Sequence, residues 1–389
     1  MKPVAHKELI VDSLNRVDWD FPRSATPAET IHALHWFPGN FIPQIPAFLI
    51  QALSSSGDVV CDPFCGSGTT GIEALRLGRR CLQSDINRAS VQVSAGKMAA
   101  FTSANVAKCL GAVMDTLLLE LKIPRSQENG DQEGSDPELK RWLHTETLDQ
   151  LRFLWDLVKS SSDVGPVLEM IFTDTLFACA SVGGAQTDGG KVRRHHWGWV
   201  ADNVTPTKPI PHDALHLFRN KVFRAIQILS TERVASKDLS TVRREDIRGL
   251  SLPSESVDLI VTSPPYLGMI DYTAANRLTY LWMGWSLRDD MKSEIGARRY
   301  RNRPTATQDY LASMEVACNQ MARILKPRGY CAVVIGASRK YPGAAHDVIK
   351  ILSKILELVW GPIPRMPSRR RVSVKGAAEA SEFICIFKK

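Results

Sequence analysis

The sequence lacks long apolar runs, paired cysteine motifs and a leader, and each absence excludes a class of protein. No stretch of about 18 apolar residues occurs, and the start MKPVAHKELIVDS has no charged-then-apolar pattern. We therefore expect neither a membrane span nor a secretory signal. The 8 cysteines contain no CxxC pair and lie mostly in apolar surroundings, which favours reduced core thiols and a cytoplasmic location.

Two kinds of site are missing as well. No Lys-Ser or Lys-Thr follows the glycine-rich stretch near residue 66, which excludes a phosphate-binding P-loop there. The histidines show no metal-ligand spacing, so we predict no metal site. No internal repeat is visible, and a repeat architecture is therefore not expected.

What the sequence does contain is a positive charge and enough apolar residues for a large core. The formal charge is +8, and basic residues gather in KVRRHHW, GARRYRNR and PSRRRVSVK. This pattern makes a polyanion such as nucleic acid a candidate partner. At 389 residues with 44% hydrophobic content, the chain is long enough for two domains or for one large domain with an insertion.

The pattern between residues 57 and 101 predicts a strand, a glycine turn, a helix, a second strand and a second helix. GDVVCDPFCGSGTTGIEALRLG gives a strand and a helix that starts near Thr69 or Thr70 and closes at Gly78. RRCLQSDIN then reads as a strand that ends in an acid, and RASVQVSAGKMAAF as a helix. HWFPGNFIPQIPAFLIQALS, before this unit, places a helix from about Ile42 to Leu53. The unit is a βαβ opening.

The alternation stops at residue 102 and resumes after residue 235. Helical patterns cover about 104–121, 137–159, 163–181 and 212–231, and STVRREDIRGL, VDLIVTSPPY, GYCAVVIG and SEFICIFKK then read as strands. We predict an α/β fold: a Rossmann-like sheet with helices on both faces and a mainly helical insertion between the second and third strands. Its parts are 1–101, 102–235 (a candidate target-recognition region) and 236–389.

Acidic residues at three predicted strand ends point to an adenosyl ligand that carries an amine. Gly66, Gly68 and Gly71 match GxGxxG, a pattern that alone does not separate a dinucleotide from another ligand. Asp62 lies on the first strand, where it suits an ammonium, and Asp85 ends the second strand, where it can accept from ribose hydroxyls. Asp246, at the third strand, can accept from an adenine amino group. The alternative, that each acid caps the following helix, stays open.

The stretch TSPPY ends the strand that begins at Val257. Pro264 and Pro265 cannot donate to a β-ladder, so the chain stops at the edge of the sheet where ligands bind. Methylating an aromatic amine is difficult because the nitrogen lone pair is delocalised into the ring. Ser263 Oγ and the Pro264 carbonyl can accept from such an NH2 group, and Tyr266 can stack on the base. The tetrapeptide is therefore a candidate clamp for a flat amine.

Together these motifs resemble those of the exocyclic-amino DNA methyltransferases, which have a Rossmann-like class I fold. DPFCGSGTT looks like the cofactor motif of that family and TSPPY like its catalytic motif, over roughly residues 31–100 and 240–340. HWFPGNF resembles the segment that closes over the methionine end of the cofactor. The resemblance implies S-adenosyl-L-methionine as cofactor, Ser263, Pro264, Pro265 and Tyr266 as catalytic residues, and these cofactor contacts: Phe37, Asp62, Phe64, Gly66, Gly68, Thr69, Asp85, Ile86 and Asp246.

Within that family, serine at the first catalytic position is more typical of cytosine N4 enzymes, so we expect N4-cytosine methylation of double-stranded DNA with base flipping. N6-adenine, RNA or protein-glutamine methylation and a non-catalytic nucleic-acid-binding subunit are the alternatives. A carbon-5 cytosine enzyme needs a cysteine nucleophile, and no Pro-Cys dipeptide occurs. A cognate restriction endonuclease is a possible partner, and the sequence leaves the oligomeric state open.

Basic and aromatic clusters are candidates for DNA contact. The densest lies in the predicted insertion, and a second follows the catalytic motif. Arginines can read guanine edges or phosphates, and aromatic side chains can wedge into a base stack. The predicted substrate-binding residues are Arg193, Arg194, His195, Trp197, Arg298, Arg299, Arg301 and Arg303. PSRRRVSVK, near the end, is a third candidate for phosphate contact.

Overall fold

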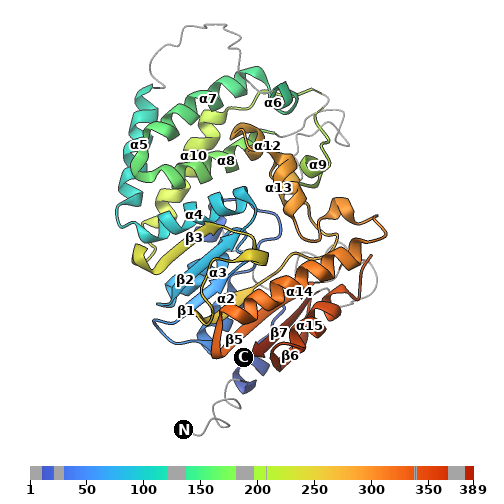
Figure 1. The fold of residues 1–389 in the computed structure, drawn as a ribbon. Helices are drawn as coiled ribbons and strands as arrows, with labels where there is room; N and C mark the ends of the chain where they lie inside the picture. Colours follow the sequence, from blue (N-terminus) through green and yellow to red (C-terminus); the bar gives the residue numbers. More distant parts are fainter. Residues whose placement is uncertain are drawn as a thin grey trace.

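A computed structural model describes residues 11–21, 30–120, 137–180, 197–206, 208–336, 338, 340–366 and 382–389. A seven-stranded sheet crosses the molecule between helical layers (Figure 1). Within the described ranges, no helix is long and apolar enough to cross a membrane. The strands are β1 (Val59–Asp62), β2 (Arg80–Asp85), β3 (Ser240–Arg244), β4 (Val257–Thr262), β5 (Leu325–Gly336), β6 (Glu357–Arg365) and β7 (Glu382–Lys388).

The strand order is β3-β2-β1-β4-β5-β7-β6. Strands β1 to β5 run parallel, and β7 is antiparallel to both β5 and β6. The chain winds outward in one direction from β1 to β3 and in the other from β4, so a crevice opens at the carboxyl ends of β1 and β4. This topology confirms the predicted Rossmann-like α/β fold.

Both faces of the sheet are covered, as the alternating side chains of β5 require. Cys331, Val333 and Ile335 face one core cluster, whereas Ala332 and Val334 face the other. The first cluster packs against α14 (Ala306–Ile324) and α15 (Ala344–Ser353), which lie together in front of the sheet in Figure 1. The second cluster packs against α2 (Gln44–Leu53), α3 (Thr69–Arg76) and α4 (Arg88–Thr102).

The helical insertion between β2 and β3 is also confirmed, and it extends the layer of α4 (Figure 1). Helix α8 crosses α4 at Gly96, where an added Cβ would lie 2.7 Å from Met170 Cβ and 2.7 Å from the Pro166 carbonyl oxygen. Only a glycine allows this approach of the two backbones. The helices are α5 (Val106–Glu120), α6 (Pro137–Trp142), α7 (Thr145–Ser160), α8 (Gly165–Cys179), α9 (Trp197–Ala201) and α10 (Ala214–Leu229).

The structure differs from the predicted elements in three places. The helix expected over 137–159 is two helices, because the backbone at His144 is extended and α7 restarts after it. The third strand ends at Arg244, and residues Ile247–Gly249 form a 3-10 helix instead of more strand. Strand β6 was not expected, since its sequence contains two prolines; it pairs with β7 through two register shifts.

A buried charge lies at the interface of α4 with the insertion. Lys97 is fully buried, and its Nζ has no hydrogen-bond partner within the described part of the chain. Burial lowers the pKa of its ammonium to about 7. Nearby, the Lys221 ammonium on α10 donates to the Asp174 carboxylate on α8. Burial alone would raise the pKa of Asp174, but the charge of Lys221 lowers it.

Candidate active site

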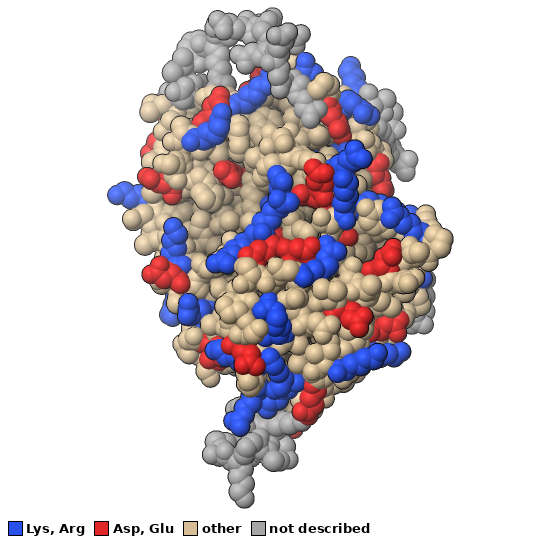
Figure 2. Space-filling model, viewed as in Figure 1, with Lys and Arg blue, Asp and Glu red and all other residues tan. Residues whose placement is uncertain are grey.

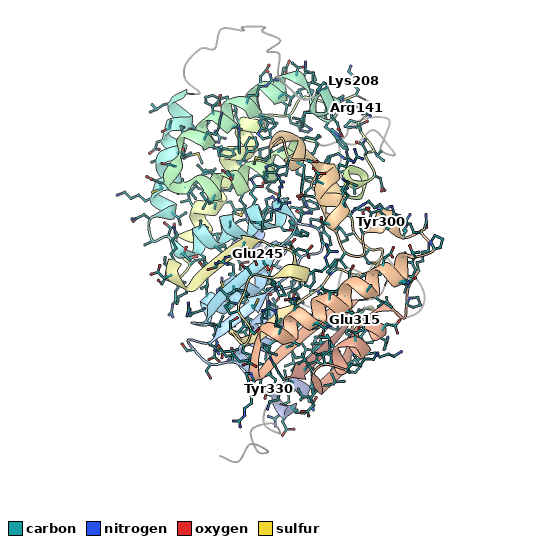
Figure 3. All side chains as sticks on the ribbon, viewed as in Figure 1. Arg141, Lys208, Glu245, Tyr300, Glu315 and Tyr330 are labelled. Atoms are coloured by element: carbon teal, nitrogen blue, oxygen red, sulfur yellow. The ribbon has the colours of Figure 1, made fainter. Side chains whose placement is uncertain are left out.

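A cavity opens at the carboxyl edge of the sheet, where the topology predicts a ligand site. It encloses about 920 Å³, counted out to its open mouth. Figure 3 labels Glu245 on its wall, close above the sheet. The lining residues include the glycine turn, the ends of β1, β2 and β3, Ser263 and Pro265 of the TSPPY motif, and residues 37, 39–41, 270, 272 and 293–295.

The glycine turn lies between β1 and α3. Gly66 and Gly68 have φ angles of 49° and 81°, in the left-handed region that favours glycine. At Gly66 the backbone N–H donates to Asp85 Oδ2 at 3.0 Å, while Phe64 and Thr69 line the cavity. Gly68 differs from the expectation, because it does not line the cavity. An added Cβ there would lie 2.6 Å from Ser94 Oγ on α4, so Gly68 lets the turn pack closely on that helix.

Two carboxylates lie on the cavity wall, at the ends of β1 and β2. Asp62 Oδ1 accepts from Thr262 Oγ1 at 2.6 Å and from the Phe64 N–H at 3.1 Å. Asp85 accepts from two backbone N–H groups, those of Gly66 and Asn87. Burial raises the pKa of each carboxyl to about 6, and these hydrogen bonds oppose the shift. Both groups are therefore mostly ionised at pH 7 and lose their charge in mild acid.

Asp246 lines the cavity as expected, but its carboxylate is already engaged. It caps the 3-10 helix at Ile247–Gly249 through the Arg248 N–H, and it forms a salt bridge with the Arg248 guanidinium at 2.6 Å. The alternative left open by the sequence, that this acid caps the helix that follows it, therefore holds for Asp246. Ile86 also lines the cavity, as expected for the residue after Asp85.

The four clamp residues, 263–266, differ from one another in how they lie relative to the cavity. Ser263 and Pro265 line the cavity, whereas Pro264 is buried and Tyr266 lies outside the lining. Ser263 Oγ and Tyr266 Oη are 3.1 Å apart and form a hydrogen bond. Burial raises the pKa of the Tyr266 hydroxyl well above its usual value, so this group stays protonated. Ser263 lies in the same cavity as Asp62 and Asp85.

The segment His35–Phe41 closes one side of the cavity and is held by the insertion. Phe37 lines the cavity and stacks on Tyr272, with ring centroids 6.4 Å apart. The ring of Trp36 stacks on that of Phe177 in α8, with centroids 4.3 Å apart. The backbone N–H of Trp36 donates to Asp174 Oδ1 at 2.9 Å. The insertion therefore contributes to the cavity by positioning this segment.

Several wall residues were missed by the sequence analysis. Tyr272 begins α11 (Tyr272–Ala275), and Glu294 follows α13 (Leu287–Ser293); no sequence motif marks either one. Asn87 could have been found, because it directly follows the predicted strand-end acid and its side chain caps α4 by accepting from the Ser90 N–H at 3.1 Å. Glu294 Oε1 accepts from the Thr273 N–H at 2.5 Å.

The arginines predicted to contact DNA divide into two groups. The Arg299 guanidinium lies inside the protein, where it forms salt bridges with Asp271 at 2.9 Å and with Glu294. Arg299 was expected to contact DNA, but its guanidinium is instead paired with these two carboxylates, one of which, Glu294, lines the cavity. Arg298 pairs with Asp202 at 3.0 Å.

The second group lies at the protein surface. Arg301 and Arg303 are exposed, and the Arg303 guanidinium lies 3.9 Å from the ring centroid of Tyr300. Figure 3 places Tyr300 at the edge of the molecule, beside the start of α14. Arg193, Arg194 and His195 lie outside the described residues, as do the side chain of Trp197 and the stretch PSRRRVSVK.

On the face that Figure 2 shows, charge alone does not mark a DNA-binding surface. Figure 2 shows Lys and Arg side chains mixed with Asp and Glu over the visible face. Within the described residues, no group of His, Cys, Asp and Glu side chains could hold a metal ion.

The cavity fits S-adenosylmethionine on three observations. The turn at Gly66 leaves its backbone open, since an added Cβ would meet only Phe37, at 3.8 Å. A buried carboxylate, Asp62, and a half-buried one, Asp85, offer acceptors for an amine and for hydroxyls. Aromatic and aliphatic side chains, among them Phe37 and Ile86, supply apolar surface between them.

Comparisons with known proteins agree with this site. A family model described as DNA methylase (N6_N4_Mtase) matches residues 13–96. The type II methyltransferase M.MjaII of Methanocaldococcus jannaschii is 21% identical over 415 aligned residues, covering 82% of this chain and 75% of that protein. M.MvaI of Kocuria varians is 23% identical over 282 residues, covering 68% and 60%. M2.DpnII of Streptococcus pneumoniae is 36% identical over 66 residues, covering 16% and 25%.

An rRNA methyltransferase of Streptomyces viridochromogenes is similar in structure at 13% identity, with a TM-score of 0.33 and coverage of 97% of this chain and 94% of that one, a likeness too distant to argue from. By the family match and the type II relatives, the chain is similar to the DNA methyltransferases that act on exocyclic amino groups.

Proposed function

We propose that this chain methylates the exocyclic N4 amine of cytosine in duplex DNA. The observation that carries the proposal is the position of Ser263, which opens into the same cavity as Asp62 and Asp85 and lies 3.1 Å from the Tyr266 hydroxyl. One wall can hold the cofactor while the motif opposite holds an amine. Serine at this position favours cytosine by the family resemblance.

Bound in the cavity, S-adenosylmethionine supplies an electrophilic methyl group. The Asp85 carboxylate accepts from the ribose hydroxyls in this proposal, and the Asp62 carboxylate faces the ammonium. Phe37, Phe64, Gly66, Thr69 and Ile86 provide the remaining contacts. Asp246 keeps its salt bridge with Arg248, so its oxygens are only partly available to an adenine amino group.

The clamp acts on the target amine by accepting a hydrogen bond from each of its two N–H groups. Ser263 Oγ accepts one and the Pro264 carbonyl accepts the other, which draws the nitrogen from its planar geometry and frees its lone pair for the methyl. Pro264 and Pro265 restrict the backbone so that this carbonyl keeps its direction. The Ser263–Tyr266 bond exchanges for bonds to the base as the base enters, and the Tyr266 ring stacks on it.

A base in a duplex does not reach this cavity, so it must be extruded. Extrusion costs a few kcal/mol, which contacts to the strand offset. The exposed Arg301 and Arg303 are the described candidates for these contacts, and Arg193, Arg194 and His195 in the insertion remain predicted ones. Since the relatives are named type II methyltransferases, we also propose a cognate endonuclease as partner.

The test is methyl transfer from labelled S-adenosylmethionine to duplex DNA and, in parallel, to RNA, with mass spectrometry of the nucleosides. We expect N4-methyldeoxycytidine, reduced roughly 100-fold or more by Ser263→Ala and by Tyr266→Ala. Ser353→Ala, which removes a hydroxyl bonded to the Ile349 carbonyl on α15, is the matched control and retains full activity.

Each other product changes a different part of the proposal. N6-methyladenine would keep the site and overturn the base, and methylated RNA would change the polymer. Cofactor binding without any methylated product would favour a non-catalytic subunit.

A further inference from the structure

The TSPPY clamp is held by a residue outside it, on another layer of the fold. Tyr310 lies on α14, where it is 2% exposed, and its hydroxyl donates to the Pro265 carbonyl at 3.1 Å. It does not line the cavity. Along the buried face of α14 it is followed by Met314, Ala317, Cys318 and Met321, all apolar, so its hydroxyl is the polar tip of an otherwise hydrophobic stripe.

This hydrogen bond fixes more than one atom. The Pro265 carbonyl belongs to the planar peptide unit that continues into Tyr266, so holding the oxygen orients the whole unit. Pro264 and Pro265 each have a ring-locked φ, which leaves few free rotations between Ser263 and that unit. The positions of Ser263 Oγ and Tyr266 Oη, 3.1 Å apart, therefore depend on where the Pro265 carbonyl is held.

The tetrapeptide is anchored at its other end by a different bond. Thr262, directly before Ser263, donates its hydroxyl to Asp62 Oδ1 at 2.6 Å. The Tyr310 hydroxyl is thus the second of two side-chain anchors that bracket the clamp. The Thr262 anchor ties the clamp to the cofactor wall, and the Tyr310 anchor ties it to α14.

The same ring also contacts a second segment next to the clamp, at residues 295–296. Gly296 packs against Tyr310 so closely that an added Cβ would lie 2.8 Å from Tyr310 Cδ2, and its φ is 66°. The Gly296 carbonyl accepts from the Gly268 N–H at 2.8 Å, and Ile295 beside it lines the cavity. Tyr310 therefore touches both the clamp and the cavity segment bonded to Gly268.

We propose that Tyr310 is a positioning residue for methyl transfer, which orients the Pro264–Pro265–Tyr266 backbone through the Pro265 carbonyl. The inference rests on the proposed function. Without the hydroxyl, a half-buried carbonyl loses its donor and the clamp gains rotational freedom. A misplacement of the clamp by well under 1 Å lowers the rate of a reaction that needs an aligned nitrogen, while the binding surfaces stay in place.

Tyr310→Phe is the test, because it removes the hydroxyl and keeps the ring that packs on Gly296. We expect kcat to fall about tenfold, with KM for the cofactor and for DNA within about twofold of the wild-type values. Tyr330→Phe is the matched control with unchanged kcat. Tyr330 lies within β5, where it pairs with Leu259 of β4 and does not line the cavity, and Figure 3 shows it near the lower edge of the view. Thermal unfolding of both variants separates a local effect from a loss of fold.

The outcomes distinguish this inference from the function on which it rests. An unchanged kcat in Tyr310→Phe, with an active wild type, would overturn the positioning role and leave the function intact. A rise in KM alone would also overturn it, because it would mean that the hydroxyl serves binding. A wild type that methylates no polymer would overturn the proposed function, and the positioning role with it.

Discussion

We predict that cofactor affinity depends on pH through the two carboxylates of the cavity wall. Burial raises the pKa of Asp62 and of Asp85 to about 6, and the proposed contacts to an ammonium and to ribose hydroxyls need both groups ionised. A group with a pKa of 6 is ionised in roughly 10 of 11 molecules at pH 7 and in about 1 of 11 at pH 5. Each carboxylate then reduces the affinity about tenfold between these values, and both together about a hundredfold.

The sign of the effect on stability is opposite and serves as an internal check. Both carboxyls bind their protons more tightly in the folded protein than in the unfolded chain. Their contribution to stability is therefore fully present below pH 3.8 and is lost as the pH rises through about 6. Through these two groups, acidification from pH 7 to 5 weakens binding without weakening the fold.

The assay is calorimetric titration with S-adenosylhomocysteine between pH 5 and 7, with circular dichroism at each pH to verify the fold. Asp85→Asn should bind more weakly at pH 7 and should lose about half of the pH slope. An affinity that stays constant across this range in the wild type would refute the reasoning, because the ligand would then be insensitive to the charge of both groups.

Two further predictions concern the buried charges near α4 and the exposed arginines Arg301 and Arg303. Lys97→Met should raise the free energy of unfolding at pH 7 by on the order of 4 kcal/mol. Above pH 7 this gain shrinks by about 1.4 kcal/mol per pH unit, because Lys97 is then already neutral in the folded protein but still protonated in the unfolded chain. Lys221→Met, which removes the cation bound to Asp174, should instead lower it by roughly 3 kcal/mol; urea unfolding of both variants checks the opposite signs. Replacing Arg301 and Arg303 by Ala should weaken DNA binding and make its salt slope about 2 less negative, with cofactor affinity unchanged; an identical slope would contradict the proposed phosphate contacts.

Local patterns allowed much of the fold to be predicted. The unit from β1 to α4 follows from short apolar runs, a glycine turn and capping residues, all of which act within a few residues of one another. The same holds for the end of β4 at the two prolines. Strand β6 was missed because its stability comes from pairing with β7 on the neighbouring edge, which its own proline-containing sequence does not indicate.

The site was predicted less completely, because the partner of a charged side chain is a tertiary property. The sequence predicted Arg299 to be a free cation in a basic cluster, yet the fold brings the carboxylates of Asp271 and Glu294 around it. Asp246 was expected to face a ligand, although Arg248, two residues later, already holds it. Residue type and spacing gave candidates for the cavity, and packing decided which of them remain free to act.

The hydrogen bond between Thr262 and Asp62 joins residues 200 positions apart in the sequence. It connects the strand that carries the amine clamp to the strand that carries a cofactor carboxylate. A ligand that changes the charge or direction of Asp62 must change the strength of this bond, and a base that moves Ser263 pulls on it from the other side. Thermodynamic reciprocity then requires that cofactor and target base alter one another's affinity by the same factor.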